Sequence, residues 1–228
     1  MDMVQMKIIA RMKSDFPDKF GIPRQSGLVE DLYSTIVFEP KYRNADALRG
    51  LDGFSHLWII WQFSKAVREE WSPTVRPPRL GGNTRMGVFA TRSPFRPNEI
   101  GLSSVRILGI ENTNEYGTVI HVAGADLMDG TPIFDIKPYI PYCDSHPDAS
   151  GGFTSAADDF LLNVNITDDL LKNIPASKQT ALIGILSHDP RPPYQQNSDR
   201  IYGITFAGLN IRFKVVGKEL TVVTISKI

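Results

Sequence analysis

Short apolar runs divide the first 140 positions into segments typical of β-strands. Such runs cover residues 7–12, 34–38, 54–63, 104–110 and 118–123. Alternating apolar positions predict strands with one buried face, whereas the nearly unbroken run FSHLWIIWQF at 54–63 predicts a central strand buried on both faces. The turn-rich sequence ENTNEYG before residue 118 predicts that the last two of these segments form an antiparallel hairpin.

Helical signals are short and lie mostly in the second part of the chain. Asn44 can cap one short helix that runs through Leu48 and ends at Gly50. Farther along, Thr167 or Asp168 can cap a helix, and Ser177 can cap another that continues to 186. The chain then returns to strand-like segments at 201–207, 209–216 and 220–225, which turn glycines separate.

A polar, acidic stretch that begins at Pro141, PYCDSHPDASGGFTSAADD, separates the strand-rich first part of the chain from the second part, which has both helical and strand-like segments. The pattern predicts a mainly β protein, in which residues 1–150 form an antiparallel β-barrel and residues 151–228 form a small α+β module. A domain boundary is therefore expected after this stretch.

The stretch MGVFATRSPFRPNEIGLSS at 86–104 is the most unusual part of the sequence. Pro94 and Pro97 fix their own φ angles and restrict the residues before them, so Arg92 and Arg96 are expected on a stiff loop between two strands. Guanidinium groups match the oxygens of carboxylates and phosphates. The sequence therefore predicts a preformed surface for a polar or anionic ligand.

Charge is unevenly distributed although the formal net charge is zero, which argues against a uniformly basic nucleic-acid binder. Residues 76–106 hold six arginines and no lysine against the single acidic residue Glu99, whereas residues 126–169 hold nine aspartates against Lys137. An arginine cluster with interspersed prolines and glycines favours geometric recognition over a merely solvated face.

Composition and absent motifs remove several classes of function. The single cysteine, Cys143, excludes an internal disulfide and a multi-cysteine zinc site. The apolar runs are too short to span a membrane, and the N-terminus is unlike a signal peptide, so a cytoplasmic protein is expected. The glycine fingerprint of dinucleotide-binding folds, the Walker A motif, H-E-x-x-H and G-x-S-x-G are all missing, and no metal is expected.

Three further positions have both a functional and a plain structural interpretation. Pro23-Arg24-Gln25 is either a second contact loop or an ordinary surface loop, with equal support for each. Asp126 and Asp129 flank a turn, where a carboxylate can face a ligand, although an aspartate that bonds its own backbone is the commoner case. His56 is interpreted as a core histidine with a backbone partner.

Five motifs are spread over most of the length of the chain. They are PRQSGLV from Pro23, RGLDGFSHLW from Arg49, RPPRLGGNTRMGVFATRSPFRPNEIGLS from Arg76, DLMDGTPIFDIKPY from Asp126 and DPRPPY from Asp189. In these motifs the chain resembles the TsaA-like family, and within it the bacterial enzymes that methylate N6-threonylcarbamoyladenosine in tRNA. The resemblance implies a β-barrel enzyme that works as a homodimer, uses S-adenosylmethionine and methylates the N6 nitrogen of the modified adenosine 3′ of the anticodon.

The resemblance also implies which residues contact the cofactor. The family has His-Gln after the HLW strand where this chain has Ser64-Lys65, so contacts at these two positions are expected through the backbone. The implied cofactor residues are Pro23, Arg24, Gln25, Ser64, Lys65, Arg92, Leu102, Asp126, Leu127, Met128 and Asp129. Arginine for the methionine carboxylate, aspartate for ribose or amino groups and leucine for adenine suit this ligand.

The general base and the RNA contacts are less determined. Asp126, Asp129 and Asp189 are acidic candidates for removing the N6 proton, and His56 is a more distant one. Plausible RNA contacts are Arg79, Arg85, Arg96, Arg191 and Tyr194. Two alternatives stay open, a non-catalytic RNA- or nucleotide-binding module and a methyltransferase that acts on a small metabolite.

Overall fold

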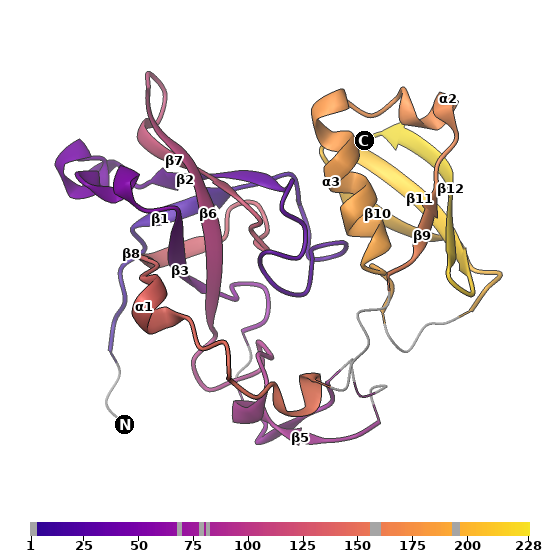
Figure 1. Cartoon of the computed structure of the whole chain (residues 1–228), viewed down its shortest axis with the longest axis horizontal. Helices are drawn as coiled ribbons and strands as arrows, with labels where there is room; N and C mark the ends of the chain where they lie inside the picture. Colours follow the sequence, from indigo (N-terminus) through magenta and orange to yellow (C-terminus); the bar gives the residue numbers. More distant parts are fainter. Residues whose placement is uncertain (1–3, 68–69, 78–79, 81–82, 156–160, 193–196) are drawn as a thin grey trace.

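The computed structural model describes residues 4–67, 70–77, 80, 83–155, 161–192 and 197–228. Two lobes are visible in Figure 1, one around the strands of the N-terminal half and one around the C-terminal sheet and its long helix. In the described ranges no helix is long and apolar enough to cross a membrane.

Six antiparallel strands form the first lobe. They are β1 (Ala10–Lys13), β2 (Tyr33–Phe38), β3 (His56–Gln62), β6 (Ile100–Thr113), β7 (Gly117–Ala123) and β8 (Pro132–Pro138). Pairing runs in the order β1-β2-β7-β6-β3-β8 and returns from β8 to β1, so the sheet closes on itself as a barrel. The expected hairpin is β6 and β7, and the mainly β class is confirmed.

The prediction that the 54–63 run is buried on both faces is wrong. Burial alternates along β3, with Leu57, Ile59 and Trp61 inside the barrel and the residues between them only half-buried. A strand of a closed sheet has one inner and one outer face, and here the outer face is covered by short segments. One of them holds Asp144, whose carboxylate accepts a 3.0 Å hydrogen bond from Trp58 Nε1.

Short elements fill the connections of this lobe. They are η1 (Pro40–Tyr42), η2 (Ala45–Leu48), η3 (Leu51–Gly53), β4 (Thr74–Val75), β5 (Met86–Gly87), η5 (Val88–Ala90), α1 (Pro141–Asp144) and η6 (Gly152–Thr154). The predicted helix after Asn44 is the 3-10 helix η2, and Asn44 caps it by accepting the Asp46 amide at 3.0 Å. The pair β4 and β5 leads directly into the arginine-bearing loop.

The second lobe is a four-stranded sheet covered by helix. Its strands are β9 (Asn163–Asn165), β10 (Tyr202–Phe206), β11 (Leu209–Val216) and β12 (Glu219–Lys227), in the order β10-β11-β12-β9. The helices are α2 (Asp168–Leu171) and α3 (Ala176–Ser187). Thr167 is the N-cap of α2 as predicted, but Ser177 lies inside α3, because Pro175 precedes the first turn.

The segment between β1 and β2 belongs to the core of the second lobe. Phe16, Val29 and Leu32 are buried among the apolar side chains of α3 and the C-terminal sheet. A Cβ on Gly184 of α3 would lie 2.7 Å from a Val29 methyl group, so glycine is needed for this close approach. We call residues 14–32 the shared segment, because it connects two strands of the first lobe and its apolar side chains complete the core of the second lobe.

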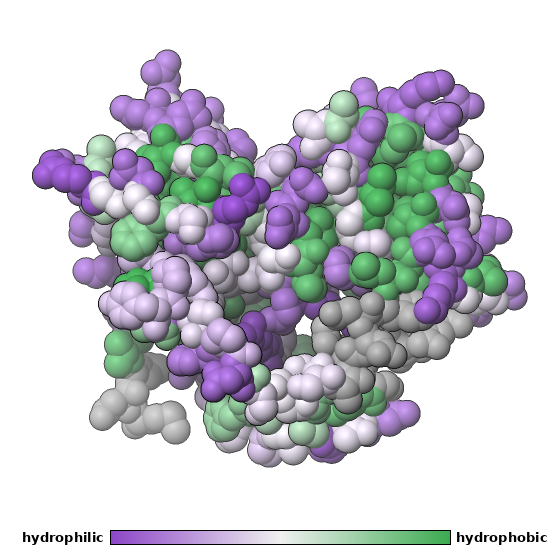
Figure 2. All heavy atoms as spheres, in the orientation of Figure 1, coloured by the Kyte–Doolittle hydropathy of each residue, from purple (hydrophilic) through white to green (hydrophobic). Residues whose placement is uncertain are grey.

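Polar contacts hold the shared segment in the same place. His188 Nε2 lies 3.0 Å from the Leu28 carbonyl oxygen, the Ala207 amide donates to the Asp15 carbonyl at 3.0 Å, and Lys178 forms an ion pair with Asp15. In Figure 1 the indigo loop after β1 reaches from the first lobe towards α3, and Figure 2 shows apolar side chains gathered over the second lobe. The division of the chain at 150/151 stays a prediction.

Candidate functional site

The loop after η5 is stiffened by its own hydrogen bonds as well as by its prolines. Arg96 Nη1 donates to the carbonyl oxygens of Thr91 at 2.9 Å and Ser93 at 3.3 Å. The Phe95 amide also donates to Ser93 Oγ at 3.2 Å. Arg96 therefore folds back over its own loop, and its guanidinium lies 6.0 Å from the centre of the Phe89 ring.

Arg92, by contrast, reaches out of this loop. Its Nη1 donates to the side-chain oxygen of Gln25, which lies in the shared segment. The Gln25 amide nitrogen in turn donates to the carbonyl of Arg24. Two loops that are 67 residues apart in sequence thus meet side chain to side chain, and the Pro23-Arg24-Gln25 loop is one half of a joint polar surface.

Asp126 is a half-buried carboxyl that interacts with both loops of this junction. Its Oδ1 accepts a 2.6 Å hydrogen bond from Ser103 Oγ, and Ser103 Oγ accepts from Trp61 Nε1 at 3.0 Å. Burial raises the pKa of Asp126, and the hydrogen bond from Ser103, the Ser26 amide and the charge of Arg92 partly oppose this rise. Asp126 therefore connects the barrel core with both loops.

The rest of the 126–129 segment anchors the start of the shared segment. Asp129 Oδ1 accepts the Ser14 amide at 3.0 Å, and Ser14 Oγ donates to the Leu127 carbonyl at 2.9 Å. The Leu127 side chain is buried in the barrel core, whereas Asp129 is exposed. The Met128 carbonyl accepts from Thr131 Oγ1 at 2.7 Å and closes the turn.

Leu102 lies on β6 between Gly101 and Ser103, and 53% of its surface is exposed. Because side chains alternate along a strand, Leu102 points away from the barrel core that Ser103 faces. Ser64 and Lys65 follow the end of β3, where the Phe63 amide donates to the Glu99 carbonyl at 2.8 Å. Ser64 is half-buried and Lys65 is exposed at the base of the arginine loop.

The predicted RNA contacts fall into different surroundings. Arg85 Nη1 donates to Thr74 Oγ1 across β4 and β5 at 3.1 Å. Arg191 is held by both carboxylate oxygens of Asp189 at 2.8 Å, and its guanidinium lies 5.9 Å from the Tyr202 ring centre. Arg79 and Tyr194 lie outside the described residues.

The alternative bases differ from Asp126 in their environments. Both oxygens of Asp189 are occupied by Arg191, as described above. His56 is half-buried on β3, with its Nδ1 2.9 Å from Ser55 Oγ and its ring 6.2 Å from the Tyr139 ring. The expected backbone partner of a buried core histidine is therefore replaced by a neighbouring serine hydroxyl.

Sequence reasoning places Gly101 in the wall of the cofactor site, but it missed two residues that shape the site, namely Trp61 and Ser103. A Cβ on Gly101 would lie 2.3–2.7 Å from atoms of the Trp61 indole, so only glycine fits beneath this ring. The available signal was a glycine and a serine placed two residues apart in a strand, opposite a tryptophan-rich strand. Only the register, which pairs Trp61 with Gly101, makes that signal specific.

Among the described residues, no group of three or more His, Cys, Asp or Glu side chains is placed so that it could hold a metal ion. The site therefore contains an arginine, a half-buried carboxyl, an amide side chain and an exposed leucine. This donor set fits a ligand with a carboxylate, hydroxyl or amino groups and an apolar ring.

Both lobes of the chain match known protein families. The family model for the tRNA-methyltransferase O N-terminal domain matches residues 11–145, and that for the TrmO C-terminal domain matches residues 160–228. A tRNA (adenine(37)-N6)-methyltransferase of Escherichia coli is 40% identical over 223 residues, which is 94% of each chain. A putative S-adenosylmethionine-dependent methyltransferase of Pseudomonas aeruginosa is 37% identical and covers 90% of each chain.

Solved structures give the same result. The crystal structure of TrmO from Pseudomonas aeruginosa superimposes with a TM-score of 0.80 at 30% sequence identity, over 100% of this chain and 98% of that one. A second crystal structure of TrmO has a TM-score of 0.79, also at 30% identity, over 99% of this chain and 100% of that chain.

Proposed function

The chain belongs to the tRNA-methyltransferase O family, and from this premise we propose that it methylates tRNA at the N6 nitrogen of N6-threonylcarbamoyladenosine, 3′ of the anticodon, with S-adenosylmethionine as the methyl donor. The observation that carries this proposal is the junction of Arg92, Gln25 and Asp126. At this junction the positive charge of Arg92 acts on the half-buried carboxyl of Asp126.

The residues of the junction suit the parts of the cofactor. We assign Arg92 or Arg24 to the methionine carboxylate, because a guanidinium can hold a carboxylate through two parallel hydrogen bonds. Leu102 offers an exposed apolar surface for adenine, and the 126–129 segment offers carboxylate and carbonyl oxygens for hydroxyl and amino groups. The bound cofactor would supply a sulfonium methyl group, which passes to N6 while the electron pair of the broken C–S bond stays on sulfur.

Asp126 is our candidate for the group that accepts the N6 proton. A carboxyl whose pKa is raised by burial is a stronger base than an exposed one, provided that it is ionised at the working pH. Asp189 has both oxygens bound to Arg191, and Asp129 is exposed and bound to the Ser14 amide. Among these three candidates, Asp126 is the half-buried carboxyl that interacts with both predicted cofactor loops.

A methyl-transfer assay tests the proposal directly. Protein is incubated with methyl-labelled S-adenosylmethionine and with tRNA that carries or lacks the threonylcarbamoyl group, and the digested nucleosides are separated by mass. We expect label on N6 of the threonylcarbamoylated adenosine. Tight tRNA binding without label would favour a non-catalytic RNA-binding module, and label on a small metabolite alone would favour the third class of function.

We also propose a cytoplasmic homodimer. Two exposed aromatic side chains, Trp71 at 51% and Phe89 at 71%, stack with ring centres 6.0 Å apart near the arginine loop. Exposed aromatic surface of this kind is typical of protein interfaces. Light scattering of the wild-type protein and of a Trp71→Ser/Phe89→Ser double variant measures the mass, and a wild-type monomer at micromolar concentration would contradict the dimer.

A further inference from the structure

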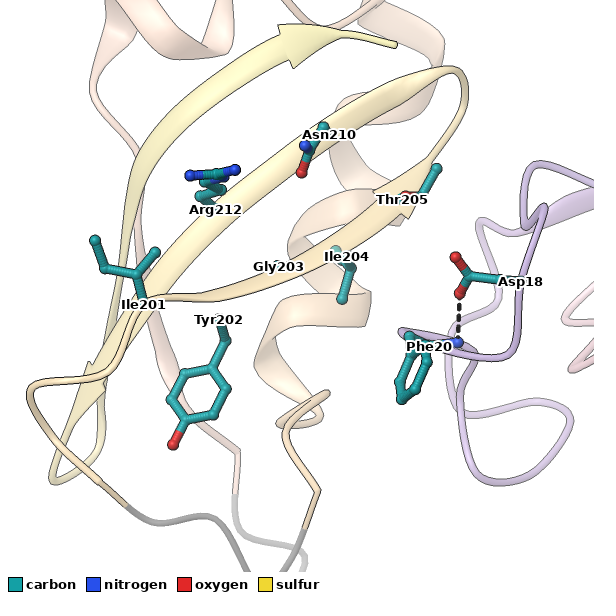
Figure 3. A pocket seen from close by; sticks show the side chains of 9 residues that line it. All are labelled: Asp18, Phe20, Ile201, Tyr202, Gly203, Ile204, Thr205, Asn210 and Arg212. Atoms are coloured by element: carbon teal, nitrogen blue, oxygen red, sulfur yellow. Dashed lines mark hydrogen bonds between the residues drawn. The ribbon is translucent and has the colours of Figure 1, made fainter.

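A cavity lies away from the junction, along the edge strand β10 of the C-terminal sheet. Its volume is about 440 Å³, within the range of roughly 300–1,000 Å³ that is usual for small-ligand sites. In Figure 3, Asp18 and Phe20 come from the shared segment and face the C-terminal sheet, whose strand β11 contributes Asn210 and Arg212. In the described part of the chain, β10 pairs with β11 alone.

The shared segment presents an exposed aromatic ring in a fixed place. Phe20 is 53% exposed, and its backbone amide donates to Asp18 Oδ1 at 2.7 Å, which holds the carboxyl beside the ring. The next residue, Gly21, packs so closely on Ile204 that a Cβ would lie 3.1 Å from its side chain, and its φ of +86° favours glycine. The ring is therefore positioned against the sheet by backbone contacts.

The floor of the cavity is open because β10 has a glycine there. Gly203 pairs with Arg212 and Thr205 pairs with Asn210, which places these four residues on the outer face of the sheet. A Cβ on Gly203 would have no neighbour closer than 3.8 Å, and its φ is not in the left-handed region. A larger side chain can thus be introduced at Gly203 without backbone strain, and it would occupy the space that glycine leaves.

Positive charge borders one side of this floor. Arg212 and Lys214 alternate along β11 on its exposed face. The carboxylate in the wall is Asp18, across the cavity on the shared segment. An aromatic ring and amide and carboxyl groups lie at one end, where Lys19 Nζ is 5.8 Å from the centre of the Phe20 ring, and Arg212 and Lys214 lie at the other. These groups match the two halves of a nucleotide, since unpaired bases stack on aromatic rings and phosphates bind cations.

We infer that this cavity binds an unpaired nucleotide of the tRNA substrate, with the base on Phe20 and the phosphate on Arg212. The inference rests on the proposed function and extends it, because it assigns RNA recognition to the shared segment and the outer face of β10 and β11. Asp18 and Asn210 then select among bases through hydrogen bonds to the base edge.

Filling the cavity tests the base half of the inference. We compare Gly203→Val with Gly109→Val, a control at a strand glycine of the barrel that also has open space around it. Fluorescence anisotropy measures the Kd of the full-length protein for labelled tRNA over a range of salt. Gly203→Val is expected to weaken binding at least about fivefold, as loss of one stacked base does, with an unchanged dependence on salt.

Removing the charge tests the phosphate half. Arg212→Gln is expected to weaken tRNA binding and to lower the slope of log K against log salt by about 0.7, the value for one phosphate contact with a single strand. Lys41→Gln, which removes an exposed cation of η1 on the barrel, is the control and should leave both unchanged. S-adenosylmethionine affinity, measured by calorimetry, should be unchanged in all four variants.

Wild-type tRNA affinity in both Gly203→Val and Arg212→Gln would overturn the inference, and Phe20→Ser repeats the test at an exposed position if either variant unfolds. Such a result would leave the proposed function intact, because wild-type methyl transfer is measured separately. The opposite result is also distinguishable. If the wild type transfers no methyl group but both variants bind tRNA more weakly, the proposed function is contradicted and the cavity is supported as an RNA site.

Discussion

Ser103 Oγ lies 2.6 Å from Asp126 Oδ1 and receives the Trp61 indole N–H at 3.0 Å, which makes a polar chain from the barrel core to the candidate site. The serine oxygen accepts a hydrogen bond from the indole, so the single hydroxyl proton of Ser103 is left to donate a hydrogen bond to Asp126. The tryptophan therefore orients the hydroxyl that stabilises the ionised carboxyl.

Asp126→Asn is expected to separate activity from stability. The raised pKa means that the folded protein holds the Asp126 proton more tightly than the unfolded chain, so ionisation destabilises the fold as pH rises above 3.8. The neutral variant removes this penalty at pH 7, and its midpoint of chemical unfolding should not fall below that of the wild type. Methyl transfer should fall at least about 100-fold if Asp126 is the base. Retained activity with Asn would exclude that role.

Ser103→Ala should move the pH profile of kcat/KM. The Ser103 hydrogen bond lowers the pKa of Asp126, so its loss raises that pKa further. Activity that needs the ionised carboxylate rises with pH through this pKa, and the acid limb should therefore shift to higher pH in the variant. Ser104→Ala, one residue along the same strand, is the matched control. An acid limb that stays in place would mean that another group controls it.

Arg92→Ala is expected to weaken S-adenosylmethionine binding about 10- to 100-fold, the effect of losing a charge-assisted hydrogen bond. Gln25→Ala removes the partner of Arg92 and should have a smaller effect, because the charge remains. Calorimetry on the purified protein measures both affinities. Arg92 would have no part in the cofactor site if the Arg92→Ala variant bound the cofactor as the wild type does.

Gly101→Ala tests the close contact under the Trp61 ring. The added methyl group would overlap the indole, so the ring or the strand must move, and overpacking of this kind costs roughly 1–3 kcal/mol. The free energy of unfolding should fall by this amount, and activity should fall with it because Trp61 orients Ser103. Gly109→Ala has open space on its strand and should leave both quantities unchanged.

A double-variant cycle decides what Arg191 does. Arg191→Ala should cost about 2 kcal/mol of stability, since the half-buried Asp189 carboxylate loses both guanidinium hydrogen bonds and keeps only the amide of residue 191. Asp189→Asn removes that charge and keeps a residue type that tolerates the φ of +48°. If Arg191 is structural, the double variant recovers stability and tRNA affinity together. If Arg191 contacts RNA, tRNA affinity stays low after stability returns.

The strands could be predicted from the sequence because their signals are local. The short apolar runs at 34–38 and 118–123 and the turn-rich sequence before residue 118 predicted two barrel strands and a hairpin. The stiffness of the 91–98 loop was also predictable, since proline acts on its own backbone.

The assembly of the site depends on long-range register, which no local pattern contains. Arg92 and Arg96 look alike in the sequence, yet one reaches Gln25 and the other bonds to its own loop. The pairing of Ser103 with Asp126 likewise requires β6 to lie beside Trp61 in one register. The burial of Phe16 in the core of the second lobe was missed because the irregular 14–27 stretch has no periodicity to indicate a buried face.

Transplanting the C-terminal lobe onto another protein would require three cuts in the chain. A graft of residues 161–228 alone would carry an uncovered apolar surface where Phe16, Val29 and Leu32 normally pack. The donor fragment would have to include 14–32 as a second piece, and the recipient would inherit the loop at Pro23-Arg24-Gln25 with it. The C-terminal lobe therefore cannot be exchanged without also replacing residues 14–32, which carry part of the candidate site.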